Sequence, residues 1–484
     1  MSIIFWLRQD LRLLDNTALQ YARQKSSDVH FLYIFEETHE DDLSTKGAAS
    51  QWFLSRALRS FQKNIEDLGG TLLIEKGDPL SILDSVAKKT RSQTICWNRR
   101  YDPYNVRKDQ KIKQTLQEKG IEVKSFKGSV LFEPWEILNQ KGEPFKVFTP
   151  FWRHCLAKNF AYTPYLSPSS LKKSSIALHH AHKKDAVDFS YDPFWSKNFS
   201  KVWEDTPFNV SEQGAHERLD FFLQNHVKDY QKTRDFPALE STSKLSPYLH
   251  LGMISPDFIM HRCYQLLSID SAYAEGIHCF LSEIGWREFS SYLLYHYPDL
   301  PTSPLRKEFL SMPWEDNPSF FDAWKKGQTG YPIVDAGMRQ LWQEGWMHNR
   351  VRMIVASFLI KDLFMDWRKG ERWFFDTLVD ADLASNSASW QWVAGCGADA
   401  APYFRVFNPT LQGEKFDPEG HYIKRYVPEL SLMPVRFIHD PSKAPHSILQ
   451  KASVVLGKKY PYPIVDHKMC RQKALEMFKN LRGK

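Results

Sequence analysis

The chain has 484 residues, of which 42% are hydrophobic, 25% are charged and 14% are aromatic. This length predicts roughly two to four domains with large cores, and the composition is that of a soluble globular protein, which excludes a disordered chain. The net charge of +7 is small for so long a chain, so it permits a nucleic-acid partner without requiring one.

Cysteine usage and hydropathy indicate where the protein works. The six cysteines are scattered, with no C-x-x-C pair and no Cys/His cluster at metal-ligand spacing, which predicts free thiols in a reducing compartment and no metal site. The apolar run at residues 3–7 is interrupted by Arg8 and Asp10, so it is not the apolar region of a signal peptide. No segment approaches the roughly 20 apolar residues that cross a bilayer, so we expect a cytoplasmic protein without membrane contact.

Short apolar runs of strand character alternate with helical segments in the N-terminal third. The runs fall at residues 3–7, 31–35, 71–75, 94–97 and 121–126. The clearest helix places Trp52, Phe61 and Ile65 on one apolar stripe and ends at Gly69 and Gly70, where left-handed backbone is readily adopted. This alternation predicts right-handed βαβ units, and hence a doubly wound parallel α/β sheet domain over residues 1–130.

The segment after the first predicted strand bears on whether a dinucleotide binds to this sheet. Such sheets usually bind ligands beyond the carboxyl ends of their strands, but this segment has no G-x-G-x-x-G fingerprint. Its four charged residues could line a ligand pocket or form a salt-bridged turn from strand to helix, and we favour the turn; they are Arg8, Asp10, Arg12 and Asp15.

Residues 131–210 are predicted to connect two domains. The stretch S-P-S-S-L-K-K-S-S is turn-rich and basic, and H-H-A-H-K-K follows it. His179, His180 and His182 could suggest a metal ion, but there are no nearby cysteines or carboxylates at helical spacing. A solvated linker is therefore the better interpretation.

The C-terminal half changes to helical spacing from about Glu212 onward. Nine of the sixteen tryptophans lie between Trp286 and Trp392. The predicted helices cover residues 217–228, 256–264, 273–289, 348–360 and 371–378. Residues 211–484 are therefore predicted to form an all-helical domain.

The stretch T-S-K-L-S-P begins at Thr242 and could bind a phosphate group. Ser246 is the predicted N-cap of a helix, and Pro247 takes its first position. Hydroxyls beside the free amides of a helix N-terminus suit a phosphate, while helix capping alone is the simpler alternative.

Two further stretches place polar groups and indoles on one helical face. Trp286 and Arg287 lie three and four residues beyond Glu283, so a carboxylate beside an indole could hold a flat base; a surface salt bridge beside a core tryptophan is the alternative. A second stripe combines an indole, an amide, a guanidinium and a thioether at Trp346, Asn349, Arg350 and Met353. Because burying such polar groups without partners is costly, we favour a binding role for this stripe.

The next polar and aromatic cluster combines carboxylates, an amide and two indoles. The carboxylates are Asp380 and Asp382, the amide is Asn386, and the indoles are Trp390 and Trp392. The indoles are two residues apart, so they point to nearly opposite sides of a helix and can serve different sites. The mixture suits a buried planar ligand, and a packed helical core with capped turns is the alternative.

Long motifs follow one another in a specific order. They are T-S-K-L-S-P-Y-L, S-E-I-G-W-R-E-F, G-Y-P-I-V-D-A-G-M-R-Q-L, G-W-M-H-N-R-V-R-M, D-A-D-L-A-S-N and W-Q-W-V-A-G-C-G-A-D-A-A-P-Y-F-R-V-F-N-P. With these motifs the chain resembles the photolyase/cryptochrome family of blue-light flavoproteins over essentially its whole length, and most of all the cyclobutane pyrimidine dimer photolyases. The resemblance implies an α/β antenna domain, a connector and a helical FAD-binding domain.

The resemblance also implies which residues hold FAD. The residues that match the site for its phosphates are Tyr230, Thr242, Ser243, Lys244, Leu245 and Ser246. Those that match the surroundings of the flavin ring are Arg352, Asp380, Asp382 and Asn386, with the Asn386 amide near N5. The tryptophans that match the family's electron-transfer chain are Trp314, Trp367 and Trp390.

The implied substrate is a cyclobutane pyrimidine dimer in UV-damaged DNA, which is flipped out of the duplex and split by an electron from light-excited reduced FAD. The residues that match the lesion pocket are Glu283, Trp286, Asn349, Met353 and Trp392. The residues placed at the DNA itself are Arg234, Arg287, Arg350 and Arg405. Glu283, Asn349 and Asn386 are the predicted catalytic residues.

Two other activities within the family remain as alternatives. Many cryptochromes, which sense light without repairing DNA, have Asp or Cys where this chain has Asn386, and many carry a long tail that this sequence does not show. Enzymes for six-four photoproducts place His at the positions of Asn349 and Met353. Both comparisons favour repair of cyclobutane dimers.

A second, light-harvesting chromophore of folate or deazaflavin type is expected in the N-terminal domain. The segment N-R-R-Y-D-P-Y-N-V-R-K-D shows Tyr104 and Asn105 where folate-binding members have an Asn-Glu pair, so the identity of this chromophore stays open. We expect a monomer without an obligate protein partner, because the sequence has no heptad repeat.

Overall fold

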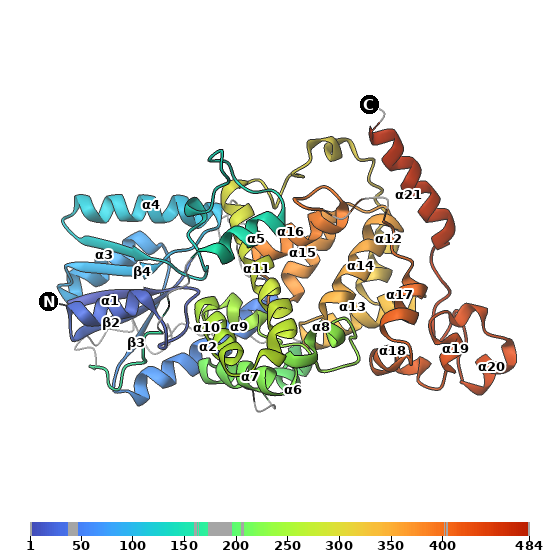
Figure 1. The fold of residues 1–484 in the computed structure, drawn as a ribbon, viewed down its shortest axis with the longest axis horizontal. Helices are drawn as coiled ribbons and strands as arrows, with labels where there is room; N and C mark the ends of the chain where they lie inside the picture. Colours follow the sequence, from blue (N-terminus) through green and yellow to red (C-terminus); the bar gives the residue numbers. More distant parts are fainter. Residues whose placement is uncertain are drawn as a thin grey trace.

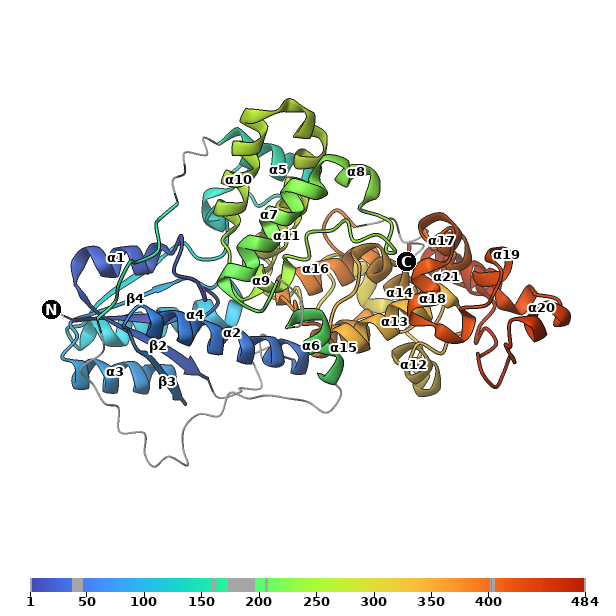
Figure 2. The same ribbon diagram turned by 90° about the horizontal axis from the view of Figure 1, so that it is seen from below.

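The computed structural model describes residues 2–36, 47–158, 162, 164–172, 196–204, 208–400, 402 and 405–482. A parallel sheet with its helices occupies one end of the molecule, and a larger assembly of helices occupies the other (Figures 1 and 2). His179, His180 and His182 lie outside the described residues. The predicted combination of an α/β part with an all-helical part is confirmed.

The five strands are all parallel and follow the order β3-β2-β1-β4-β5. Their bounds are β1 Ser2–Leu7, β2 Asp28–Phe35, β3 Leu72–Lys76, β4 Thr94–Asn98 and β5 Glu122–Phe126. Each of the five predicted runs is a strand, and its ends lie within three residues of the predicted ones. The order of strands reverses between β1 and β4, which is where doubly wound sheets usually open a ligand crevice.

Four helices cover the two faces of this sheet. They are α1 Thr17–Lys25, α2 Ala48–Asp67, α3 Pro79–Thr90 and α4 Pro103–Glu118. Ile3 and Phe5 of β1 share a buried cluster with α1 and α2, whereas Ile4 and Trp6 share another with α3 and α4. Successive strand residues therefore feed opposite apolar layers, and the sheet is buried on both sides.

The rest of the chain is helical in its described part. Its α-helices are α5 Phe148–Ala157, α6 Phe199–Trp203, α7 Glu212–Asn225, α8 Tyr230–Thr233, α9 Ser246–His250, α10 Pro256–Ile269, α11 Ala274–His296, α12 Pro318–Lys325, α13 Pro332–Glu344, α14 Asn349–Lys361, α15 Trp367–Thr377, α16 Leu383–Ala394, α17 Pro409–Phe416, α18 His421–Tyr426, α19 Val435–Ile438, α20 His446–Lys451 and α21 His467–Arg482. Short 3₁₀ turns link several of them, namely η1 Pro134–Glu136, η2 Ser196–Asn198, η3 Val227–Asp229, η4 Ser271–Tyr273, η5 Lys307–Ser311, η6 Pro428–Leu430 and η7 Pro441–Lys443.

All five predicted helices of this half exist, and capping explains where their bounds differ. Ser211 accepts a hydrogen bond from the Gly214 amide, so α7 starts five residues before the predicted Glu217. Asp366 accepts from the Arg368 amide and starts α15 four residues before the predicted position. Periodicity of apolar residues locates a helix better than it locates the polar residue that begins it.

The two parts of the molecule are joined by buried carboxylates that hold backbone amides. Glu288 of α11 accepts hydrogen bonds from the amides of residues 131 and 132, and Glu212 of α7 accepts from the amides of residues 13 and 14. Helix α2 runs from the sheet toward α15, where the Ser50 hydroxyl donates to the Leu378 carbonyl at 2.9 Å (Figure 2). The connection is therefore built from directional bonds as well as apolar contact.

The turn after β1 docks onto the turn that follows α9. The Leu11 amide donates to the Leu251 carbonyl at 3.2 Å, and the Arg12 guanidinium donates to the Gly252 carbonyl at 2.9 Å. Gly252 has a φ of +66°, and a Cβ there would lie 2.0 Å from the Gln9 carbonyl oxygen. Only glycine fits this approach.

Replacing Gly252 with alanine is expected to destabilise the protein by several kcal/mol, because the residue combines a left-handed backbone with a backbone clash. The matched control is Gly120→Ala, since Gly120 has a φ of +80° but nothing within 4 Å of its would-be Cβ. Thermal unfolding of both variants measures the clash separately from the backbone strain. Equal losses of stability would show that the domain contact at Gly252 contributes nothing.

No helix in the described ranges is long and apolar enough to cross a membrane. The six cysteines are all unpaired, as predicted, and Cys96, Cys155, Cys263 and Cys396 are buried. Among the described side chains, no group of three or more His, Cys, Asp or Glu residues is arranged to hold a metal ion.

Candidate functional site

Asp380 is the centre of the polar cluster that was matched to FAD. Its side chain is 3% exposed, and its Oδ2 accepts hydrogen bonds from the Ser246 hydroxyl at 2.5 Å and from Arg352 Nη2 at 2.8 Å. Its Oδ1 is buried and has no hydrogen-bond partner among the described residues. A buried carboxylate with one unsatisfied oxygen is suited to a ligand that donates a hydrogen bond.

The role predicted for Ser246 as an N-cap is wrong. Helix α9 begins at Ser246 itself, with Leu245 before it, so Pro247 takes the second helical position. The Ser246 hydroxyl is free to turn toward Asp380 because it does not cap the helix. The sequence pattern gave this hydroxyl the helix amides as its partner, whereas its partner in the structure is Asp380.

The predicted helical stripe from Trp346 to Met353 is only partly correct. Helix α14 begins at Asn349, so Trp346 precedes it and does not share its face. Trp346 is buried, and two cations lie near its ring, with Lys244 Nζ at 5.2 Å and the Arg352 guanidinium at 5.9 Å. A flat ring flanked by cations can anchor a loop that faces an anionic ligand.

Lys244 belongs to the loop that was matched to the FAD phosphates. Its backbone is left-handed, with a φ of +49°, and its ammonium pairs with Glu240 at 2.7 Å. A non-glycine residue in this conformation is uncommon and is found more often at binding sites. The loop is thus held in an unusual shape beside Ser246.

Asn386 lies in helix α16 and is buried against α15. Its Nδ2 donates to the Glu371 backbone carbonyl at 2.9 Å, which fixes the orientation of the amide. The next residue, Ser387, donates its hydroxyl to the Glu371 carboxyl. Glu371 is therefore a supporting residue of Asn386 that sequence reasoning missed, because nothing in its local sequence indicates burial.

Burial raises the pKa of Glu371 to about 8, and the hydrogen bond from Ser387 opposes this shift only in part. The folded state therefore binds a proton that the unfolded state, with a pKa near 4.5, has already released. Stability from this group is fully present below pH 4.5 and is lost as the pH rises to about 8. At neutral pH a neutral acid, and no negative charge, lies beside Asn386.

The isosteric variant Glu371→Gln is expected to remove this pH dependence. The free energy of unfolding of the variant minus that of the unchanged protein should increase by about 1.4 kcal/mol for each pH unit between 5 and 8, because only the unchanged protein loses stability there. Denaturant unfolding at several pH values measures the difference between the two proteins, so other titrating groups cancel. Parallel stability curves would contradict a protonated Glu371.

Residues that were matched to the lesion pocket lie in a second cluster on helices α11 and α14. Glu283 pairs with Arg234 Nη1 at 2.5 Å, and the Arg234 guanidinium lies 5.4 Å from the centre of the Tyr230 ring. Arg350 pairs with Asp235 at 2.6 Å, and its Nη1 lies 3.8 Å from the Met353 sulfur. The two arginines are thus oriented by adjacent acidic partners.

Other predicted site residues carry structural contacts. Trp286 stacks on Phe148 with ring centroids 3.9 Å apart, and Arg287 donates to the Ser129 carbonyl at 2.6 Å. Asp382 caps α16 by accepting from the Ser385 amide at 2.8 Å. These contacts position the residues, and their predicted roles toward DNA and flavin stay predictions.

Asn349 and Trp392 lie more open than their neighbours. Asn349 is exposed at the start of α14, and Trp392 is half-buried in α16. Trp390, two residues earlier, is buried, as expected for opposite sides of a helix. The predicted division of the two indoles between different surroundings is confirmed.

The predicted electron-transfer tryptophans differ in their surroundings. Trp390 and Trp367 are each 2% exposed, whereas Trp314 is half-buried. The Trp390 ring contacts Phe374 at 5.0 Å and Trp324 at 6.3 Å between centroids, and in the described part of the chain it makes no ring contact with Trp367. Their order as an electron chain therefore stays a prediction.

His348 caps α14 and was not assigned from the sequence. Its Nδ1 accepts from the Arg350 amide at 3.2 Å, so Nε2 carries the hydrogen, and Nε2 is buried without a partner in the described residues. Burial lowers the pKa of His348 to about 4, so the ring is neutral. His348 Nε2 and Asp380 Oδ1 are thus two buried polar atoms without a hydrogen-bond partner among the described residues. These residues fit a polar cofactor such as FAD.

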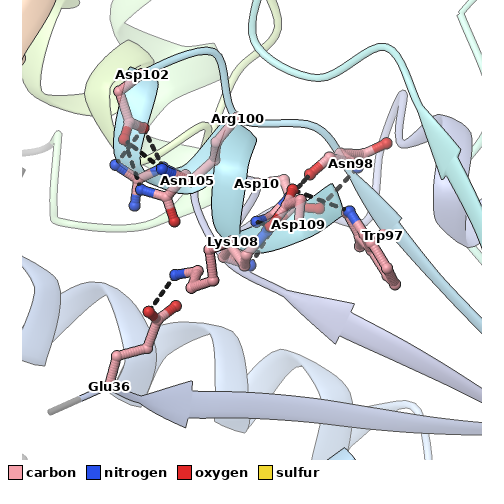
Figure 3. A network of polar contacts seen from close by, with 10 residues as sticks. Asp10, Glu36, Trp97, Asn98, Arg100, Asp102, Asn105, Lys108 and Asp109 are labelled. Atoms are coloured by element: carbon pink, nitrogen blue, oxygen red, sulfur yellow. Dashed lines mark hydrogen bonds and ion pairs between the residues drawn. The ribbon is translucent and has the colours of Figure 1, made fainter. Parts of the chain in front are cut away.

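Ion pairs and hydrogen bonds gather at the carboxyl ends of β1 and β4, beside a cavity that is lined in part by Gln9, Arg100, Tyr101 and Asp102. Arg8 pairs with Asp109 at 2.7 Å, and the Trp97 indole and the Asn98 amide donate to Asp109 and Asp10 (Figure 3). Lys108 pairs with Glu36 at the end of β2. Arg8 and Asp10 therefore form a salt-bridged and hydrogen-bonded turn, which is the interpretation that the sequence favoured.

Three comparisons with known proteins agree on the family. Residues 3–169 match the DNA photolyase family, and residues 280–480 match the FAD binding domain of DNA photolyase. A deoxyribodipyrimidine photo-lyase from Agrobacterium fabrum is 46% identical over 98% of this chain and 97% of its own length. Cryptochrome-1 of Arabidopsis thaliana is 36% identical over 96% of this chain and 68% of its own length.

A solved structure extends this agreement to the fold. The structure of a bacterial class III photolyase from Agrobacterium tumefaciens matches with a TM-score of 0.93 and 45% identity, covering 100% of this chain and 98% of that chain. The chain therefore belongs to the DNA photolyase family, with that family's FAD-binding domain in its helical half.

Proposed function

We propose that the chain is a deoxyribodipyrimidine photo-lyase that reverses cyclobutane pyrimidine dimers in UV-damaged DNA under blue light. One observation carries the proposal: Asn386, matched to the flavin, and Trp392, matched to the lesion pocket, lie on the same helix, α16. Six residues separate them, which is about 9 Å along a helix axis. Cofactor and lesion would thus be neighbours, as electron transfer between them requires.

Reduced FAD, held by this chain, would supply the light-driven electron transfer that opens the ring of the dimer. The chain supplies the surroundings of this transfer. Asn386 would offer a neutral amide to the flavin, and the paired Asp380 and Arg352 would hold its polar edge. Buried apolar side chains exclude water from the path.

The lesion residues would recognise the two bases and stabilise the charge that forms on them. Glu283 and Asn349 can hydrogen-bond to base edges, and Trp286 and Trp392 can stack on the bases. The dimer gains one electron, two carbon–carbon bonds of its ring break, and the electron returns. The reaction therefore needs no net oxidant or reductant.

Affinity for DNA would come from phosphates and not from base sequence. Arg234 and Arg350 are oriented by Glu283 and Asp235, and Arg405 is exposed. Guanidinium groups held at fixed positions bind phosphates in two-point geometry. Binding should weaken as salt rises.

The second chromophore would not occupy the ion-pair network at the strand ends. Arg8 pairs with Asp109 and Lys108 with Glu36, and the Trp97 indole donates to Asp109. A folate or deazaflavin in the place of these side chains would have to displace charged pairs, which is costly. We propose that any antenna chromophore binds outside this network, and absorption and fluorescence spectra of the purified protein identify it.

Binding of the purified protein to three labelled duplexes in darkness tests the proposal. A duplex with a cyclobutane thymine dimer should bind at least about a hundredfold more tightly than undamaged DNA, as expected for a flipped and pocketed base. A duplex with a six-four photoproduct should bind no better than undamaged DNA. Equal affinity for all three duplexes would favour a cryptochrome-like protein, and tightest binding of the six-four product would favour that repair activity.

A further inference from the structure

A basic groove lies beside Arg405, outside the lesion cluster. One wall carries Arg405, Phe407 and Leu411, from the loop before α17 and from α17 itself, and the other carries His467, Lys468 and Arg471 of α21. No carboxylate is among the described side chains that line it. Figure 1 shows α17 and α21 on the same end of the helical half.

Both walls are fixed to helix α14. The buried Lys361 donates to the Arg405 carbonyl at 3.0 Å, and the Ser357 hydroxyl accepts from the Phe407 amide at 3.4 Å. On the other side, His467 pairs with the buried Asp362 at 2.6 Å. The groove is therefore part of the rigid fold and is not formed by chance between loose surface loops.

The cations of α21 are placed where the helix itself does not favour them. Lys468 and Arg471 are exposed in the first turns, near the positive end of the helix dipole. Asp466 already caps this end by accepting from the Met469 amide at 3.0 Å. Neither Lys468 nor Arg471 forms an ion pair with a described carboxylate. Their charge is available to an outside anion.

We propose that this groove binds the sugar-phosphate backbone of the damaged DNA strand at a distance from the lesion. Lys468 and Arg471 would add phosphate contacts to that of Arg405, and Leu411 would offer an apolar surface to the sugars. The inference rests on the proposed function, because it takes the lesion pocket as the fixed end of the strand. The cations of the two walls are complementary to a polyanion, and the apolar side chains between them suit its sugars.

Helix α14 gives the distance between pocket and groove. Asn349 begins the helix and Lys361 ends it, so the two sites lie about 20 Å apart at 1.5 Å per residue. One DNA strand rises about 3.4 Å per nucleotide, so the groove lies about six nucleotides from the lesion. A short damaged strand would fill the pocket without reaching the groove.

The double variant Lys468→Glu/Arg471→Glu tests this with two single strands, of about 4 and about 20 nucleotides, each with one central thymine dimer. Affinity for the long strand should fall at least about tenfold, and the slope of log affinity against log salt should become less steep by about 1.4. Affinity for the short strand and its repair in light should not change. The control Lys111→Glu/Lys479→Glu reverses two exposed charges outside the groove and should alter neither affinity.

The outcomes separate the groove from the proposed function. If the unchanged protein does not repair even the short strand, the proposed function fails. If it repairs both strands and the double variant binds both as tightly, the groove is not a DNA site. Equal losses on the short and the long strand would also overturn the groove, since they would place its cations at the lesion. Flavin content per protein, measured for each variant, confirms that the fold is intact.

Discussion

Replacing Asp380 with alanine is expected to give a purified protein without bound flavin and to lower its free energy of unfolding by about 3–5 kcal/mol. The loss arises because the Arg352 guanidinium and the Ser246 hydroxyl lose the buried acceptor that they share. An uncompensated guanidinium in a low-dielectric site is costly, and the loop of Lys244 loses its anchor to α14. Flavin absorbance per protein and thermal unfolding measure the two effects.

A surface ion pair supplies the control for this experiment. Asp316 pairs with Lys369 at 2.5 Å, but its side chain is 72% exposed, so Asp316→Ala should change the stability by less than about 1 kcal/mol. The conservative variant Asp380→Asn keeps an acceptor for Ser246 and should fall between the two. Full flavin content in Asp380→Ala would remove Asp380 from the cofactor site.

Replacing Glu283 with alanine is expected to weaken binding of dimer-containing DNA and to slow dimer splitting, each by about tenfold to a hundredfold. Loss of a hydrogen bond to a charged group costs about 1.5–3 kcal/mol, which is of this size. Arg234 also loses the carboxylate that orients it at 2.5 Å. Flavin content should not change, because Glu283 does not contact the Asp380 cluster in the structure.

The variants Glu283→Gln and Glu204→Ala sharpen this prediction. In Glu283→Gln the side chain keeps an acceptor for the bases but holds Arg234 less strongly. We therefore expect the affinity of this variant for DNA to fall more than its rate of dimer splitting. Glu204 pairs with Arg56 at 3.2 Å in the contact between α2 and the end of α6, and its loss should affect neither quantity. Unchanged kinetics in Glu283→Ala would exclude Glu283 from the lesion pocket.

Sequence patterns predicted the fold more fully than the site. The five strands follow from short apolar runs between helical segments, because burial on both faces leaves a continuous apolar signature. The first residues of α7 and α15 differ from the predicted ones. A single capping residue, such as Ser211 for α7, decides where a helix begins, and the spacing of apolar residues does not reveal the cap.

The polar contacts of the site depend on tertiary neighbours that no local pattern contains. The hydroxyl of Ser246 turns to Asp380, which lies 134 residues later in the chain. Glu371 supports Asn386 through its backbone carbonyl, a group that every residue carries. Motif order selected the candidate residues, but only the packing of α15 against α16 gives Asn386 its partner.

The Arg8–Asp15 segment shows the opposite case, in which the simpler interpretation is correct. In an open parallel sheet, ligands usually bind where the order of the strands reverses. Here Arg8 pairs with Asp109. Asp10 accepts from the Asn98 amide (Figure 3), so both charged side chains are engaged within the protein. Fold alone does not place a ligand.

The most direct test of the account is repair under anaerobic light by protein whose flavin has been reduced beforehand, with no other electron donor present. A dimer-containing oligonucleotide in large excess should regain the ultraviolet absorbance of intact thymines over many turnovers, while the flavin spectrum before and after illumination is the same. This is the result that a returning electron predicts. Repair that stops after one turnover with oxidised flavin, or no recovery of thymine absorbance in light, would contradict a light-driven cycle between the Asn386 and Trp392 sides of α16.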